Sequence, residues 1–205
     1  YSYMDHTGGY YMAMAIMLVL LERDKSGEGQ WVDLACTEAG LSLNGPALLD
    51  WTVNNRPMRQ PDGFSSNRSQ YSLMAPHGMY PCSGDDEWIA IACRDDNDWQ
   101  VLASFINEVW CGDYSSLENR LDRQDELDES IENWTKQKEK FDLQDRLRQL
   151  SIPVAAVQKP GERIDHDPTT GNFALWPTVT HSEMGDVRVD GLPVHFSETD
   201  WEMTA

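Results

Sequence analysis

The sequence is poor in positive charge. It holds 16 lysines and arginines against 35 aspartates and glutamates, so the formal net charge of its 205 residues is −19 at pH 7. Non-specific binding to nucleic acid requires clustered lysine and arginine side chains that neutralise phosphates. The composition therefore predicts a protein that does not bind nucleic acid.

Cysteines and long hydrophobic runs are also scarce. The four cysteines show no C-x-x-C spacing, which indicates reduced thiols in a cytoplasmic protein. The longest apolar run covers residues 12–21, too short to cross a bilayer, so we expect a buried helix and no membrane partner. The five histidines lack the spacing of metal ligands, and we predict no metal site.

The first quarter of the chain has the pattern of an α/β layer. Residues 7–25 are small or apolar on nearly every side, which predicts a buried helix that Thr7 caps. Residues 30–36 read as a strand, and residues 38–53 as a second apolar helix with a kink at Gly45-Pro46. Helix, glycine turn, strand and helix in this order are typical of a layered α/β domain.

The remainder predicts a different organisation. Residues 54–72 are rich in Asn, Arg, Pro, Gly and Ser and indicate a linker or a long functional loop. The predicted hairpin pairs residues 78–82 with residues 88–92, and Asp95 or Asp96 then caps a helix. Further elements, listed in chain order, are helical patterns around 127–134 and 143–150, a strand at 152–157, and strand-like stretches near 173–179 and 186–189.

Several motifs occur along the chain in the same order as in a known protein family. They are DHTGG at residues 5–9, RDKSGEGQWVD at 23–33, GMYPCSGD at 78–85, WIAIA at 88–92, IPVA at 152–155 and Asp167-Pro168. Together they resemble the class III coenzyme A (CoA) transferases of the CaiB–BaiF type. The resemblance covers nearly the whole chain and corresponds to a carboxy-terminal half that begins at the catalytic aspartate.

The resemblance implies a fold of the α/β class. Residues 1–60 would be the remnant of a Rossmann-like large domain that carries the catalytic aspartate. Residues 61–160 would form a small α+β domain with the hairpin and helices, and residues 161–205 a C-terminal linker or return segment. Members of this family form homodimers of two interlocked chains, so a homodimer is expected, with simple or interlocked pairing left open.

The resemblance also implies a reaction. Asp5 matches the carboxylate that attacks the thioester of an acyl-CoA, so acyl-CoA and a carboxylic acid are the expected partners, with the CoA thioester as substrate and no covalently bound cofactor. A carboxylate nucleophile needs desolvation and amide groups that stabilise the oxyanion. Position and spacing alone favour a simple helix-capping role for Asp5, and the family resemblance is what favours the nucleophile.

Five further residues are candidates for substrate binding. Gly8 and Gly9 permit close approach of either a ligand or a neighbouring helix. His6 stands beside Asp5, and Tyr71 and His77 belong to a stretch where formyl-CoA transferase-like members have a run of glycines. This chain lacks that run, so an ordinary connection between domains is the favoured interpretation of the stretch. The alternative is a bulkier loop that lines an acyl pocket, with Tyr71 or His77 at a substrate carboxylate.

Two alternatives stay open. The α-methylacyl-CoA racemases share the aspartate but carry a glutamate before the hairpin cysteine, where this chain has Pro81. Proline cannot act as a general base, which disfavours racemisation. The other alternative is a truncated, non-catalytic fragment that folds and dimerises.

Overall fold

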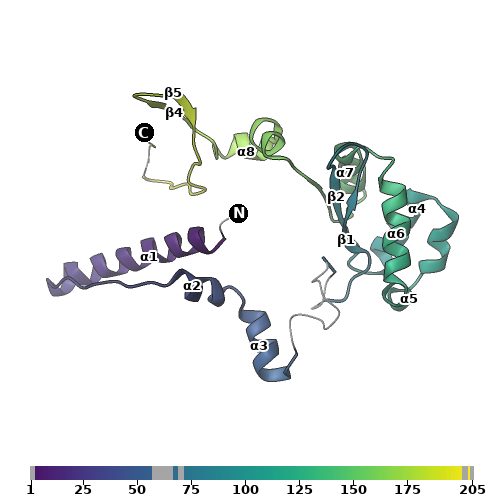
Figure 1. Ribbon diagram of the computed structural model, residues 1–205, viewed down its shortest axis with the longest axis horizontal. Helices are drawn as coiled ribbons and strands as arrows, with labels where there is room; N and C mark the ends of the chain where they lie inside the picture. Colours follow the sequence, from purple (N-terminus) through teal and green to yellow (C-terminus); the bar gives the residue numbers. More distant parts are fainter. Residues whose placement is uncertain (1–2, 57–66, 69–71, 200–202, 204–205) are drawn as a thin grey trace. The chain divides into compact units, whose positions relative to one another are not determined.

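The computed structural model describes residues 3–56, 67–68, 72–199 and 203 (Figure 1). The chain divides into two compact units, residues 1–65 and residues 66–205. Helices and strands are both present, as the α/β prediction requires, while a Rossmann-like origin of the first unit stays a prediction. Among the described residues, no helix has the length and hydrophobicity needed to cross a bilayer.

The first unit consists of α1 (Tyr3–Ser26), α2 (Cys36–Ser42) and α3 (Gly45–Asn54), and α1 lies alongside α2 (Figure 1). Helix α1 begins four residues before Thr7, so Thr7 is not its cap. The predicted helix over 38–53 is two helices, because Pro46 fits the first turn of a new helix better than the interior of an old one.

The strand predicted over residues 30–36 was wrong. Residues 30–35 form no regular element, and Cys36 already starts α2. A strand is stable only when its backbone groups pair with a neighbouring strand. The described residues of the first unit contain no strand to pair with.

The second unit is built on a three-stranded antiparallel sheet. Strands β1 (His77–Pro81), β2 (Trp88–Ala92) and β3 (Val154–Val157) lie in the order β1-β2-β3, which confirms the predicted hairpin and the strand near 152–157. Tyr80 pairs with Ile89, and Ile89 with Ala156. These three side chains are buried, so this row belongs to the covered face of the sheet.

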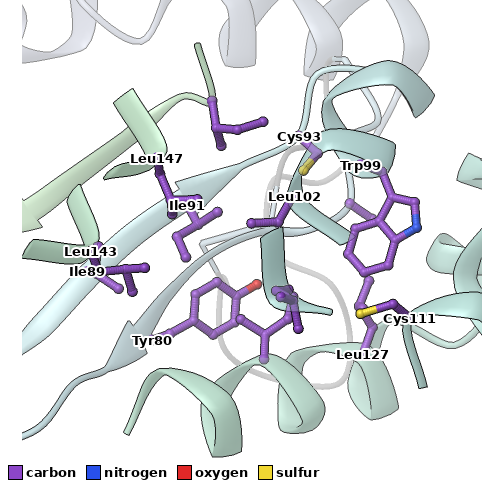
Figure 2. Close-up of a cluster of buried hydrophobic side chains, with 14 of the residues drawn as sticks. Tyr80, Ile89, Ile91, Cys93, Trp99, Leu102, Cys111, Leu127, Leu143 and Leu147 are labelled. Carbon is purple, nitrogen blue, oxygen red and sulfur yellow. The ribbon is translucent and has the colours of Figure 1, made fainter. Parts of the chain in front are cut away.

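Helices cover that face. They are α4 (Asp96–Ile106), the 3-10 helix η1 (Val109–Tyr114), α5 (Leu117–Asp122), α6 (Gln124–Thr135) and α7 (Lys140–Gln149). The shared core includes Ile91, Trp99, Leu102 and Leu127 (Figure 2). As expected, Asp95 is the N-cap of α4 and accepts a hydrogen bond from the N–H of Asp98.

The C-terminal part continues with the π-helix η2 (Glu162–His166), α8 (Pro168–Asn172), β4 (Thr178–His181) and β5 (Gly185–Arg188). Strands β4 and β5 pair with each other as a separate antiparallel hairpin. The strand predicted over 173–179 begins only at Thr178, because Phe173 forms the end of α8 instead.

Two buried cations stabilise the second unit. The Arg120 guanidinium donates to the carbonyl oxygens of Ala75 and Tyr114 and to the Asp96 carboxylate. The Lys140 ammonium is also buried and has its own carboxylate partners. An unpaired charge in the interior would be strongly destabilising, so both cations are paired. Their carboxylate partners are distant in sequence, and each cation therefore joins separate segments of the unit.

Candidate functional site

Asp5 lies in the first turn of α1. Its side chain is exposed and makes no hydrogen bond within the described part of the chain. The first N–H groups of a helix have no partner inside the helix and carry partial positive charge. The carboxylate of Asp5 is therefore next to backbone donors that favour negative charge, and it is open to a ligand.

Close packing with α2 fixes this end of α1. A Cβ atom added at Gly8 would lie 2.6 Å from the sulfur of Cys36, and one added at Gly40 would lie 2.8 Å from Cγ of Met4. Gly8 therefore permits the close approach of α1 and α2, and its role in substrate binding stays a prediction. Our sequence interpretation did not identify Gly40, although the adjacent small residues Ala39 and Gly40 were the available signal.

Gly9 is in a different environment from Gly8. It is exposed, and a Cβ atom added there would have no other atom within 4 Å outside its own helix backbone. Gly9 follows Asp5 by four residues, so both lie on one face of α1. A side chain at position 9 would point back toward Asp5, and the glycine leaves that space clear.

The other predicted site residues that the structure describes, His6 and His77, belong to different units. His6 is exposed next to Asp5 on α1. His77 belongs to the second unit, at the start of β1, where its Nδ1 lies 2.5 Å from the carbonyl oxygen of Asn67. Because a carbonyl only accepts, this contact requires the tautomer with the proton on Nδ1. Tyr71 lies outside the described residues.

The buried cysteines are poor competitors for a nucleophilic role. Burial raises the pKa of the Cys82 thiol to about 11 and that of Cys93 to about 12. Burial also raises the pKa of Cys111. The reactive form of a cysteine is the thiolate, which is rare at neutral pH when the pKa is this high. Of the four thiols, Cys36 alone is exposed.

Within the residues that the structure describes, no group of three or more His, Cys, Asp or Glu side chains has the arrangement of a metal site. The candidate site therefore consists of one exposed carboxylate, the helix N-terminus that carries it, and the clear face beside Gly9. Such a site is suited to attack on an electrophilic carbon or to the binding of a polar group.

Relatives with assigned names are similar over nearly all of this chain. The formyl-CoA:oxalate CoA-transferase of Streptomyces coelicolor is 24% identical over 213 residues, which cover 98% of this chain and 52% of the relative. The succinyl-CoA–L-malate CoA-transferase alpha subunit of Chloroflexus aurantiacus is 22% identical over 205 residues, 98% of this chain and 46% of the relative. The chain thus spans about half the length of these relatives.

A solved structure is similar in fold. A CaiB/BaiF family protein from Brucella suis matches with a TM-score of 0.79 at 20% identity, over 98% of this chain and 50% of that protein. The family model described as CoA-transferase family III matches residues 1–205. The motifs, the fold and this match across the full length agree, and the chain belongs to CoA-transferase family III.

Proposed function

We propose that this chain carries the catalytic aspartate of an enzyme that transfers CoA from an acyl-CoA to a carboxylic acid. The observation that carries the proposal is Asp5 on the first turn of α1, with an open face beside Gly9, in a chain of the CoA-transferase family. The names of the relatives specify CoA transfer, and those named here include no racemase. We therefore propose the transferase and not the racemase.

The proposed reaction uses Asp5 as a covalent nucleophile. An oxygen of Asp5 attacks the thioester carbon, the carbon–sulfur bond breaks, and a mixed anhydride and CoA thiolate form. The thiolate then attacks the carbonyl carbon of Asp5 and releases the first carboxylic acid, leaving an aspartyl thioester. A second carboxylate repeats these two steps in reverse, so that it leaves as the new acyl-CoA and Asp5 regains its carboxylate.

The first turn of α1 supports this chemistry electrostatically. Negative charge develops on the carbonyl oxygen during each attack, and free N–H groups at a helix N-terminus stabilise such charge. Asp5 is hydrated in the chain as described, because it is exposed. Attack requires that the bound acyl-CoA, together with the rest of a full-length or partnered enzyme, displaces that water.

The proposed partners are an acyl-CoA, a carboxylic acid and a second polypeptide. One relative is named as an alpha subunit, which agrees with an enzyme assembled from more than one chain. Large apolar side chains in the first unit are exposed, among them Met14, Met17, Leu18 and Trp31. Exposed apolar surface of this kind favours association, and we propose a homodimer.

The test is covalent trapping on Asp5. The chain is incubated with succinyl-CoA and its intact mass is measured, before and after hydroxylamine, which converts an aspartyl thioester into a hydroxamate that stays on the residue. We expect an adduct on Asp5 that is lost in Asp5→Asn. Cys36→Ala is the matched control, because Cys36 is the exposed thiol near α1 and the one expected to acylate without catalysis.

Three outcomes oppose the proposal. An adduct that survives in Asp5→Asn and disappears in Cys36→Ala means that the thiol, and not the carboxylate, was modified. Deuterium entering the α-carbon of a 2-methylacyl-CoA from heavy water, without acyl transfer, means a racemase. A folded dimer that forms no adduct, alone or with its full-length relatives, means a non-catalytic fragment.

A further inference from the structure

The second unit contains a groove that the proposed reaction does not use. Its volume is about 680 Å³, and it lies between α7 on one side and η2 with the start of α8 on the other. The floor is formed by Ala155 and Ala156 of β3, an edge strand of the sheet. Pockets for small molecules commonly have volumes of ~300–1,000 Å³.

One stripe of α7 forms the first wall. Phe141, Gln144, Asp145 and Arg148 line the groove, and their spacing places them on a single helix face. The Gln144 side-chain oxygen accepts from the Ala156 N–H at 2.9 Å, and Nε of Arg148 lies 3.4 Å from the Val154 carbonyl oxygen. The stripe is therefore held along the edge of β3.

The opposite wall has its charges already satisfied. The Asp167 carboxylate accepts from Arg163 at 2.6 Å and from Gln158 at 2.8 Å. Glu162 accepts from the buried Lys140 ammonium at 2.7 Å. The Lys140–Glu162 ion pair joins η2 to α7, whereas the Arg163–Asp167 pair lies within one wall; in each pair the two charges cancel.

Arg148 and His166 differ from these paired groups. Arg148 forms no ion pair within the described part of the chain, although the protein has 35 acidic residues. His166 makes no hydrogen bond there, and it lines the groove opposite α7. A guanidinium offers paired donors that match the two oxygens of a carboxylate or phosphate. Phe141 and Pro168 supply apolar surface beside them.

We propose that this groove binds a small organic anion, with its carboxylate or phosphate on Arg148 and His166 and its apolar body against Phe141 and the β3 floor. Asp145 is on the same wall and repels the anion, so the anionic group binds beside Arg148 and away from Asp145. Every residue that lines this groove belongs to the second unit, whereas Asp5 belongs to the first.

Titration calorimetry on the full chain tests the proposal with three probes: acetate, pentanoate and inorganic phosphate. We expect saturable binding, and pentanoate at least fivefold tighter than acetate because its chain covers apolar surface. Arg148→Gln should weaken binding at least tenfold, and Asp145→Asn should strengthen it. Arg146→Gln is the matched control, since Arg146 is on the same helix with the same charge but pairs with Asp142 outside the groove.

The relative affinities of the three probes identify the class of anion. Tighter binding of phosphate than of either carboxylate assigns the site to phosphate esters, and the reverse assigns it to carboxylates. Absence of saturable binding by all three probes at 50 mM, on the order of the weakest useful affinity, overturns the proposal. Equal weakening by Arg146→Gln and Arg148→Gln also overturns it, because the effect would then reflect net charge alone.

Discussion

At the scale of single residues, two adjacent glycines in α1 serve different purposes. Gly8 is buried against Cys36, whereas Gly9 faces open space on the side of Asp5. The sequence alone could not separate them, because the difference comes from α2, which approaches one glycine and not the other. The sequence predicted Asp5 just ahead of a helix over 7–25, and the structure has it inside the first turn, because α1 begins at Tyr3.

Replacing each glycine by alanine should separate the two roles. We expect Gly9→Ala to stabilise the chain by about 0.5–1 kcal/mol, because alanine favours the helix and meets no atom. Gly8→Ala should be less stable than Gly9→Ala by about 1–3 kcal/mol, because its Cβ overlaps the Cys36 sulfur. Urea unfolding followed by circular dichroism measures both, and Cys36→Ala should rescue Gly8→Ala.

Arg120 gives the second prediction at this scale. Its side chain is fully buried and donates to two backbone carbonyls and to Asp96. Arg120→Met removes all of these donors at once and leaves the Ala75 and Tyr114 carbonyls without them, so we expect a loss of about 3–5 kcal/mol in the free energy of unfolding. A loss below 1 kcal/mol in chemical denaturation would show that water replaces these bonds.

At the scale of secondary-structure elements, local signals predicted the second unit better than the first. The hairpin was visible because its turn and alternating residues lie close together in sequence, and α4 was visible from its cap and apolar spacing. The strand expected over 30–36 failed because strand formation depends on a partner that the sequence pattern does not specify. The groove beside α7 was also not predicted, because its two walls are separated in sequence and are joined by a tertiary contact, the ion pair between Lys140 of α7 and Glu162 of η2.

The cap of α4 provides the element-scale prediction. Asp95 accepts from the N–H of Asp98, which otherwise has no partner inside the helix. Asp95→Ala should lower the free energy of unfolding by about 1 kcal/mol, whereas Asp95→Asn should retain most of the stability. Thermal unfolding of the two variants tests this, and equal losses in both would assign the effect to charge and not to the cap.

At the scale of the whole molecule, several carboxylates of the second unit accept hydrogen bonds that stabilise their negative charge. Hydrogen bonds from Lys140 lower the pKa of Glu87 and of Glu162, and a hydrogen bond from Arg94 lowers the pKa of Asp98. Hydrogen bonds from Thr169 and Gln158 lower the pKa of Asp167. A chain with a net charge of −19 would otherwise repel itself in the compact state.

These lowered pKa values predict acid sensitivity. A carboxyl group with a lower pKa in the folded state contributes stability above its unfolded pKa, and that contribution is lost as the pH falls through the folded pKa. The melting temperature should therefore drop as the pH is lowered below ~4.5, the upper end of the ordinary carboxyl range. Lys140→Met should be less stable at pH 7 and should lose less on acidification, because Glu87 and Glu162 no longer have their shared partner.

The open face at Gly9 has a consequence for how such a protein drifts under mutation. In a library sorted only for correct folding, position 9 would accumulate other amino acids, while positions 8 and 40 would remain glycine because α1 and α2 touch there. Only sorting for turnover would retain glycine at position 9. Glycine at position 8 would then be conserved under selection for folding, and glycine at the adjacent position 9 only under selection for catalysis.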